Sequence, residues 1–471
     1  MLILSGATHI WNAAGFPAIF FDEGVYMRRA MNVLDGFGPQ ESFYHDHPFF
    51  GQIFLASTLG LIGFPNSLHP LATTGSIATL YLAPRIIMGI LAIVDTFLIY
   101  KIAESLYGRK VALISSMLFA VMPITWLVRE ILLDSILLPF LLMSIFLSLH
   151  SKDSNHKNLM VLLSGICLGL AIFTKIPASA IIPLVAGLIY FNNGKKLKLV
   201  GLLLVPVILI SLIWPLQSVE SGQFDLWVKD VLGQAERHSY GLPYISYLFL
   251  KMDPVLFVLG ITGIAFSIAR RDYFILMWFV PFMIFLLAIG YNQYFYWIPV
   301  LPVFCISTSL FIVKVLEKTK KENLRRNLAV VVFSIGVFGL ASTLLIINTN
   351  MTSSQFQTTS FVLQHVDGND TTILASPSYS WIFSHVFHKQ NVLVDYTAVL
   401  FQPITTHKVV LIADEHYMLV EIGKGKQFGQ LYNGSKTVAT FTNDKKYNLS
   451  SYPYTNLGVN YEENPIEVRE K

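Results

Sequence analysis

The feature that most constrains the fold of this chain is a succession of long apolar runs. Of its 471 residues, 54% are apolar and only 13% are charged, and the mean hydropathy is +0.57. A helix needs about 20 apolar residues to cross roughly 30 Å of hydrocarbon. The sequence therefore predicts a polytopic α-helical membrane protein with about eleven spans, at residues 1–21, 80–103, 111–128, 131–149, 158–174, 177–191, 199–216, 254–269, 273–290, 296–313 and 328–347.

Lys and Arg residues between the predicted spans indicate the orientation of the chain. They concentrate in five loops, at 104–110, 150–157, 192–198, 270–272 and 314–327. The longer segments on the other side carry few of them. An excess of positive charge is typical of cytoplasmic loops. We therefore expect the first long loop, 22–79, and everything after residue 348 to lie at the external face of the plasma membrane.

The chain beyond residue 348 is polar and contains short β-like runs at 372–375, 392–395 and 409–413. Runs of this length between polar turns are typical of strands. The sequence therefore predicts two units, a transmembrane domain over 1–348 and a small external α/β domain over 349–471. The formal net charge of +4 is too small to indicate a nucleic-acid partner.

Two adjacent carboxylates, Asp22 and Glu23, follow the first apolar run and begin the outer loop at 22–79. A charge near the bilayer is unfavourable unless it stays hydrated, so such residues are often functional. Tyr26 and His47 lie in the same loop. This concentration of polar groups at one membrane face makes the loop the candidate active site. Interfacial carboxylates that stay in water and have no catalytic role would also explain Asp22 and Glu23.

Three cationic side chains, Arg85, Arg129 and Lys175, lie at the predicted outer ends of separate spans. A lipid phosphate lies at this depth, and Arg offers it a bidentate contact whereas Lys offers a point charge. Long cationic side chains also extend to lipid headgroups for purely structural reasons. Asp134 lies four residues after Glu130, on the same helical face, and predicts an ion network beside Arg129.

Five elements occur in order along the chain: Phe21-Asp22-Glu23-Gly24-x-Tyr26, His47-Pro48-x-x-Gly51, Arg85, Arg129 with Asp134, and Gly169-Leu-Ala-Ile-Phe-Thr-Lys175-x-Pro177. Together they resemble the dolichyl-phosphate-mannose protein mannosyltransferase superfamily, which has the GT-C membrane fold. The resemblance covers roughly residues 10–190, with a weaker similarity at 294–302. The chain has His-Pro-Phe-Phe-Gly where many members have His-Pro-Pro-Leu-Gly, so the resemblance does not imply which acceptor is used.

The resemblance implies a membrane glycosyltransferase that moves a sugar, in the first instance a mannose-like hexose, from a polyprenyl- or dolichyl-phosphate carrier to a hydroxyl. The acceptor hydroxyl belongs to a protein, a lipid or a glycan. By the same resemblance, Asp22 is the general base with Glu23 in support, and Arg85, Arg129 and Lys175 bind the donor phosphate. Because the donor is already activated, a base and cations suffice. We therefore expect an inverting transfer that needs no metal and no cofactor.

Further residues are expected to contact the substrate or shape the site: Tyr26, His47, Asp134, His238 and Tyr240. The last two lie in the long loop at 217–253, where they could close over the acceptor, although ordinary packing within the loop is the more common role of such residues. The segment 45–47, His-Asp-His, also has the composition of a metal site. An isolated His-x-His is a weak indication of metal binding, so we predict none.

Two other functions stay open on the sequence alone. A metal-dependent oligosaccharyltransferase also has the GT-C architecture and an acidic first loop, but its expected Trp-Trp-Asp-Tyr-Gly signature is absent from this chain. A transporter would carry charges along a path through the membrane, between inverted repeats. Here the charges gather at one face, so the transporter ranks third.

Overall fold

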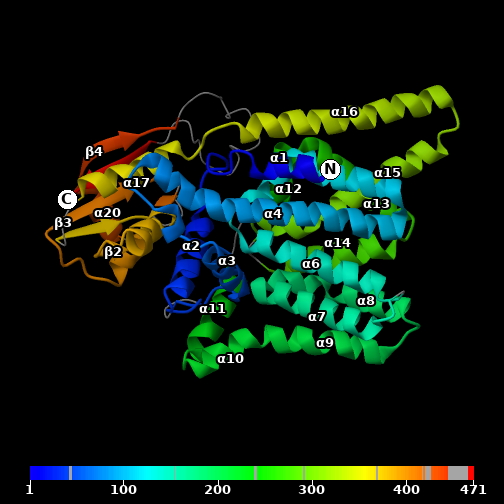
Figure 1. The fold of residues 1–471 in the computed structure, drawn as a ribbon, viewed down its shortest axis with the longest axis horizontal. Coiled ribbons are helices and arrows are strands. Elements are labelled where there is room, and N and C mark those ends of the chain that lie inside the picture. Colours follow the sequence, from blue (N-terminus) through cyan, green and yellow to red (C-terminus); the bar gives the residue numbers. More distant parts are fainter. Residues whose placement is uncertain are drawn as a thin grey trace.

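The computed structural model describes residues 1–41, 45–152, 154–237, 241–289, 292–366, 370–415, 417–418, 426–443 and 465–471. Figure 1 shows a bundle of long helices with a small sheet-containing part at one end. Helices α2 and α3 lie at the junction between the bundle and the sheet. The predicted first outer loop therefore folds largely as helices at this junction.

The helices of the bundle are α1 (Leu2–Ile10), α2 (Phe21–Leu34), α3 (Phe50–Leu61), α4 (Thr74–Tyr107), α5 (Arg109–Val121), α6 (Leu133–His150), α7 (Lys157–Thr174), α8 (Ile182–Asn192), α9 (Leu197–Ser211), α10 (Ile213–Glu220), α11 (Phe224–Glu236), α12 (Leu242–Met252), α13 (Pro254–Ala269), α14 (Tyr273–Ala288), α15 (Leu301–Lys318) and α16 (Glu322–Ile347). Short 3-10 segments connect some of them: η1 (Asn66–Leu68), η2 (Pro123–Arg129), η3 (Ile176–Ile181) and η4 (Tyr294–Val300).

Six helical stretches in the described part of the chain are long and apolar enough to cross a membrane: α4, α6, α7, α9 with α10, η4 with α15, and α16. Two further pairs, α5 with η2 and α13 with α14, bend by 70° and 119°, and counting each pair as one span gives eight. The protein is thus an integral membrane protein, but the predicted number of about eleven spans is not confirmed. The predicted span at 1–21 contains only the nine-residue helix α1, and those at 254–269 and 273–290 are the arms of one bent pair.

The C-terminal part contains α17 (Ser353–His365), β1 (Thr371–Leu374), α18 (Pro377–Trp381), η5 (Ile382–Val386), β2 (Val392–Leu393), η6 (Tyr396–Leu400), β3 (Lys408–Ala413), α20 (Lys426–Asn433), β4 (Lys436–Phe441) and β5 (Ile466–Glu470). The strand order is β2-β1-β3-β5-β4, with β2, β1 and β3 parallel and β5 antiparallel to both β3 and β4. The three parallel strands confirm the three β-like runs predicted from the sequence. Strands β1 and β3 are buried almost throughout, as parallel strands usually are.

The C-terminal part packs directly on α2 and α4. Tyr81 of α4 donates a hydrogen bond to the carbonyl of Ser378 at 2.7 Å and accepts one from the Trp381 indole at 3.0 Å. Gly24 of α2 lies so close to the backbone of Pro377 and Ser378 that a Cβ atom would collide with it. The glycine of the Phe-Asp-Glu-Gly element therefore allows the N-terminus of α2 to approach the C-terminal part.

Candidate active site

Helix α2 presents its first two carboxylates to different surroundings. Asp22, Tyr26 and Arg29 are spaced by four and three residues and so share one face of the helix. Glu23 lies on the adjacent face. Its Oε2 atom accepts a 2.8 Å hydrogen bond from the backbone N–H of Phe20, which satisfies one of the free donors at the start of the helix.

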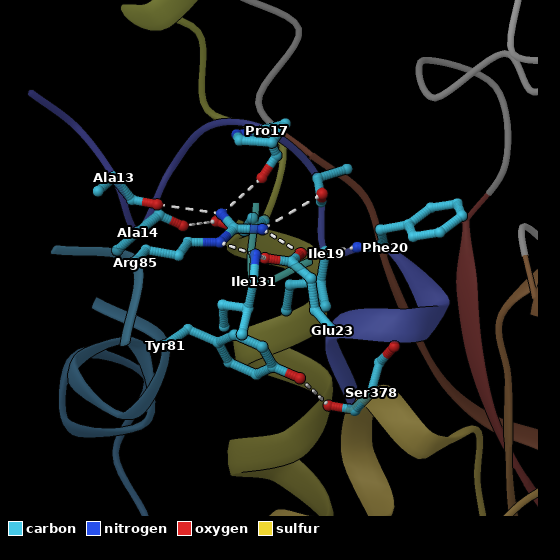
Figure 2. A network of polar contacts seen from close by, with 12 residues as sticks. Ala13, Ala14, Pro17, Ile19, Phe20, Glu23, Tyr81, Arg85, Ile131 and Ser378 are labelled. Carbon is cyan, nitrogen blue, oxygen red and sulfur yellow. Dashed lines mark hydrogen bonds and ion pairs between the residues drawn. The ribbon is translucent and has the colours of Figure 1, made fainter. Parts of the chain in front are cut away.

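Glu23 forms a buried ion pair with Arg85 of α4. Figure 2 shows that Nε and Nη2 of Arg85 donate to the two carboxylate oxygens, at 2.9 and 2.6 Å. The other guanidinium N–H groups donate to the backbone carbonyls of Ala13, Pro17 and Ala18, at 3.0, 2.7 and 3.3 Å. Both side chains of the pair are fully buried.

This pair leaves no donor for a phosphate. A guanidinium has five N–H donors, and all five donors of Arg85 bond to protein atoms. Glu23 is equally saturated, because its Oε1 atom also accepts from the backbone N–H of Ile131 at 2.9 Å. The geometry therefore does not support the expectation that Arg85 binds the donor phosphate and that Glu23 takes part in catalysis. The pair instead ties α2 to α4 and to the segments that precede α2 and α6.

Asp22 lies in a different environment from its neighbour. Its side chain is partly exposed, and no hydrogen bond joins it to another residue in the described part of the chain. Burial in the surrounding protein raises the pKa of Asp22 to about 6, an effect that Lys175 opposes and that the carboxylates of Asp46 and Asp134 reinforce. A carboxylate with this pKa is mostly ionised at pH 7 and is basic enough to accept a proton.

A second buried ion pair joins Asp134, at the start of α6, to Lys175, directly after α7. The Nζ atom of Lys175 lies 2.5 Å from Oδ2 of Asp134, and each side chain is only 1% exposed. The ammonium also lies 4.0 Å from the ring centre of Tyr296 and 4.7 Å from that of Phe295, both in η4. These are cation–π distances. The Oδ1 atom of Asp134 is buried without a hydrogen-bond partner among the described residues.

Gly51 brings the start of α3 up to this second pair. A Cβ atom at position 51 would collide with the side chain of Leu133 and press on that of Thr174. These two residues directly precede Asp134 and Lys175 in the sequence. The glycine of the His-Pro-x-x-Gly element therefore lets α3 pack closely against the ends of α6 and α7 without displacing the Leu133 side chain.

An ion network that the sequence analysis did not predict holds the connection between α2 and α3. Arg29 contacts Asp46 at 2.7 Å and Glu41 at 3.2 Å, and Arg28 contacts Glu41 at 2.6 Å. Burial alone would raise the pKa of Asp46, but the Arg29 guanidinium holds it below its ordinary value. The Arg-Arg doublet was visible in the sequence, but spacing along an irregular loop does not predict which acid pairs with which base.

His47 and Tyr26 add neutral groups beside Asp22. Burial lowers the pKa of His47 to about 4, and the nearby charge of Asp46 only partly offsets this effect because Lys175 lowers the pKa further. Burial, and then the carboxylates of Asp22 and Asp46, raise the pKa of Tyr26 well above its ordinary value. At neutral pH the imidazole is therefore uncharged and the phenol keeps its proton, so both offer hydrogen bonds without adding charge.

Arg129 is not part of this group. Arg129 is buried, donates to the backbone carbonyl of Trp11 and lies 5.5 Å from the ring centre of Phe16, beside the segment that connects α1 to α2. His238 and Tyr240 fall outside the residues that the structure describes.

The structure brings together five of the predicted site residues: Asp22, Tyr26, His47, Asp134 and Lys175. They combine a carboxylate base, two neutral hydrogen-bonding groups and a buried ammonium. Within the described ranges, no three His, Cys, Asp or Glu side chains are placed to hold a metal ion. The arrangement has the parts needed to remove a proton and to stabilise a developing anion.

Comparison with known proteins agrees with this architecture. Residues 75–216 match the family model described as dolichyl-phosphate-mannose-protein mannosyltransferase. No curated protein sequence matches the chain. The fold is similar to that of ArnT from Cupriavidus metallidurans bound to undecaprenyl phosphate, with a TM-score of 0.63 and 12% identity over 99% of this chain and 96% of that one.

The fold is also similar to that of the Archaeoglobus fulgidus oligosaccharyltransferase in its apo form, with a TM-score of 0.56 and 12% identity over 88% of this chain and 68% of that one. The same organism's AglB, in complex with an inhibitory peptide and a dolichol-phosphate, matches with a TM-score of 0.53 and 11% identity over 87% and 67% of the two chains. This chain has the GT-C fold. The predicted resemblance is thereby confirmed at the level of the GT-C superfamily.

Proposed function

We propose that this GT-C protein transfers a sugar from a polyprenyl-phosphate carrier to a hydroxyl acceptor. The observation that carries the proposal is the approach of the partly exposed Asp22 carboxylate to the buried Asp134–Lys175 pair. The carriers bound to the similar ArnT and AglB structures, undecaprenyl phosphate and a dolichol-phosphate, support this class of donor. The description of the matching family model supports mannose as the sugar.

In the proposed reaction, the acceptor hydroxyl attacks the anomeric carbon of the sugar while the bond from that carbon to the carrier phosphate breaks. The hydroxyl proton passes to Asp22, whose pKa of about 6 suits a base that works near neutral pH. The carrier phosphate leaves with the bonding electron pair and gains negative charge in the transition state. A single displacement of this kind inverts the anomeric configuration.

We assign Lys175 to the departing phosphate. An ammonium has three N–H donors, and Asp134 is the acceptor for Lys175 among the described residues. The rings of Tyr296 and Phe295 contact the ammonium without accepting a conventional hydrogen bond. A cation in such a water-poor site interacts more strongly with a developing anion than it would in water.

The remaining residues have supporting roles in this proposal. The saturated Glu23–Arg85 pair fixes the N-terminus of α2 and so positions Asp22. Tyr26 and His47 contact the sugar or the acceptor as neutral hydrogen-bonding groups.

We also propose that the reaction takes place at the external face of the plasma membrane. The positively charged loops, such as the one at 104–110 between α4 and α5, lie at the ends of the spans opposite to α2 and the sheet. The positive-inside rule then places the site and residues 349–471 outside. Labelling of single introduced cysteines in intact cells with an impermeant maleimide tests this orientation.

The test of the function is transfer from a polyprenyl-phosphate-mannose donor by the purified protein in lipid vesicles. Asp22→Asn keeps the shape of the side chain but cannot accept a proton, so we expect transfer to fall by at least about 10²-fold, the usual contribution of a general base. Asp225→Asn, at an exposed position in α11, is the matched control and should transfer at the wild-type rate. Transfer by Asp22→Asn at the wild-type rate would remove Asp22 from the mechanism.

A further inference from the structure

A cavity of about 420 Å³ lies in the C-terminal part, and none of its lining residues belongs to the site described above. It opens between the end of β3, the helix α20 and the start of β5. Strand β3 is the last strand of the parallel half of the sheet, and β5 runs antiparallel beside it, with Ala413 opposite Glu467. Ligands of open α/β sheets bind beyond the carboxyl ends of the parallel strands, where the strand order changes. The cavity lies beyond the carboxyl end of β3, on the side of β5, and so shares the first of these two features but not the switch point between β1 and β3.

The cavity walls combine apolar surface with hydrogen-bond acceptors. Phe428 and Tyr432 supply aromatic surface, and Glu415, Asn433 and Glu467 supply carboxylate and amide groups. A pyranose ring matches this mixture, because it has an apolar face of C–H groups and a rim of hydroxyl donors. Among the described residues that line the cavity there is no Lys, Arg or His, and the Arg469 guanidinium behind the wall is already paired with Glu467. The cavity is thus poorly suited to a phosphate and well suited to a neutral saccharide.

Two of the wall residues are held in place by Arg469. Its Nη1 atom donates to Oε2 of Glu467 at 2.6 Å, and Thr437 donates to the same oxygen at 3.1 Å. The Oε1 atom of Glu467 has no hydrogen-bond partner among the described residues and can accept one from a ligand. The Arg469 guanidinium also lies 4.3 Å from the ring centre of Tyr432. An acceptor oxygen and an aromatic wall are thus pre-organised, which lowers the entropy lost when a ligand binds.

Gly429 leaves the cavity open. A Cβ atom at this position of α20 would meet no other atom within 4 Å, in contrast to Gly24, whose backbone neighbours exclude a side chain.

The cavity is also connected to the start of α2. Met418 lines it, and the adjacent Tyr417 has its ring centre 6.3 Å from that of Phe21. The Tyr417 hydroxyl donates to the backbone carbonyl of Ile19. Phe21 directly precedes Asp22, so one packed side chain separates the cavity wall from the segment that carries the proposed base.

We propose that this cavity is a saccharide subsite that binds the glycan portion of the acceptor. The inference rests on the proposed transferase function and deepens it: the acceptor hydroxyl belongs to a saccharide or glycoconjugate that already carries at least one neutral sugar. The aromatic wall packs against the apolar face of that sugar, and the acceptors on the rim bind its hydroxyls.

The test separates binding from transfer. The full-length protein in lipid nanodiscs is applied to an array of neutral mono- to tetrasaccharides. Gly429→Trp fills the cavity, Gly429→Ala leaves most of it open, and Gln430→Trp places the same indole at the exposed neighbouring position of α20. We expect the wild type, Gly429→Ala and Gln430→Trp to bind the same saccharides, and Gly429→Trp to bind them at least tenfold more weakly with an unchanged Tm.

A second variant guards against misfolding of Gly429→Trp. Asn433→Ala removes only an exposed amide and should weaken saccharide binding severalfold. Binding by both variants at wild-type strength, or a wild-type protein that binds no saccharide on the array, would overturn the proposal.

Transfer assays with the saccharide selected on the array separate this proposal from the function on which it rests. We expect Gly429→Trp to raise the KM for that acceptor at least tenfold and to leave the KM for the polyprenyl-phosphate donor unchanged. An unchanged acceptor KM in an active protein refutes the subsite and leaves the transferase function intact. A different result would refute the transferase function and retain the subsite. In that case the wild-type protein binds the saccharide but transfers no sugar, and Gly429→Trp loses the binding.

Discussion

Two buried ion pairs lie near α2, and they differ in how completely they are satisfied. In the Glu23–Arg85 pair, every guanidinium donor and both carboxylate oxygens bond to protein atoms. In the Asp134–Lys175 pair, a single 2.5 Å contact joins the charges, and Oδ1 of Asp134 has no partner in the described part of the chain. Two acid–base pairs that are almost equally buried therefore have different capacities for a further ligand.

The difference shows how a structural ion pair can be distinguished from a functional one. Burying a charge is unfavourable unless hydrogen bonds and an opposite charge replace water. A saturated pair meets this requirement without a substrate and so serves the fold. A pair that leaves a buried polar atom unsatisfied is explained more simply by a group that arrives during function. Four predictions test this distinction, beginning with the largest expected effect.

Breaking the saturated pair should destabilise the protein most. Arg85→Met leaves the buried Glu23 carboxylate without its counter-ion, and such a change typically lowers the free energy of unfolding by about 3–5 kcal/mol. Thermal unfolding of the purified protein in detergent measures this as a lower Tm. The double variant Glu23→Gln with Arg85→Met should recover part of the loss, because no charge then remains buried. An unchanged Tm in Arg85→Met would show that the pair does not tie α2 to the bundle.

Replacing the unsaturated pair should affect transfer instead of stability. Lys175→Met combined with Asp134→Leu removes both charges together, so the Tm should stay the same or rise. Sugar transfer should fall about 10²–10³-fold, because the departing phosphate loses its cation. Initial rates in vesicles and a thermal unfolding scan of the same preparation measure the two effects. A double variant that retains transfer but unfolds at a lower temperature would reverse the assignment of the two pairs.

The pH dependence of transfer should report Asp22. Only the ionised carboxylate accepts a proton, so kcat/KM should fall about tenfold per unit as the pH drops below the pKa of about 6. The negative charge of Asp134 raises this pKa, so Asp134→Asn should move the inflection to lower pH. Initial rates between pH 4.5 and 8 give the profile, with Asp225→Asn as the control. If the profile of Asp134→Asn has its inflection at the same pH as the wild type, the inflection reports a titratable group other than Asp22.

Metal removal should have the smallest effect, because Lys175 supplies the positive charge beside the leaving phosphate. We expect transfer to continue at an unchanged rate after dialysis against EDTA. Loss of transfer that a divalent cation restores would favour an oligosaccharyltransferase-like mechanism. It would also show that Lys175 and Asp134 do not form a self-sufficient anion site.

The sequence predicted the parts of the site that depend on local order. Asp22, His47 and Lys175 were placed in the candidate site because they occur in a recognisable succession near the ends of apolar runs. The same reasoning assigned Arg85 to the phosphate, because it too lies near the outer end of a span. A sequence shows that a cation is present at a membrane face, but it does not show that backbone carbonyls 67 to 72 residues away already occupy its donors.

The number of spans was harder to predict for a related physical reason. Hydropathy measures how apolar a segment is, whereas crossing a bilayer also requires an uninterrupted helix of sufficient length. The break between α13 and α14 was visible as the charged loop at 270–272, but the angle of 119° between the two helices is not visible in their composition.

By itself, the sequence determined that this is a helical membrane protein with a small α/β part and the motif order of the GT-C superfamily. The tertiary structure alone decided which partners each of the two adjacent carboxylates meets. Neighbouring residues on a helix point about 100° apart, so Asp22 and Glu23 face different surroundings. Glu23 meets Arg85 and two backbone N–H groups, which bind its carboxylate completely. Asp22 senses the charges of Lys175, Asp46 and Asp134 and has no hydrogen-bond partner among the described residues, because residues distant in sequence determine how each charge is satisfied.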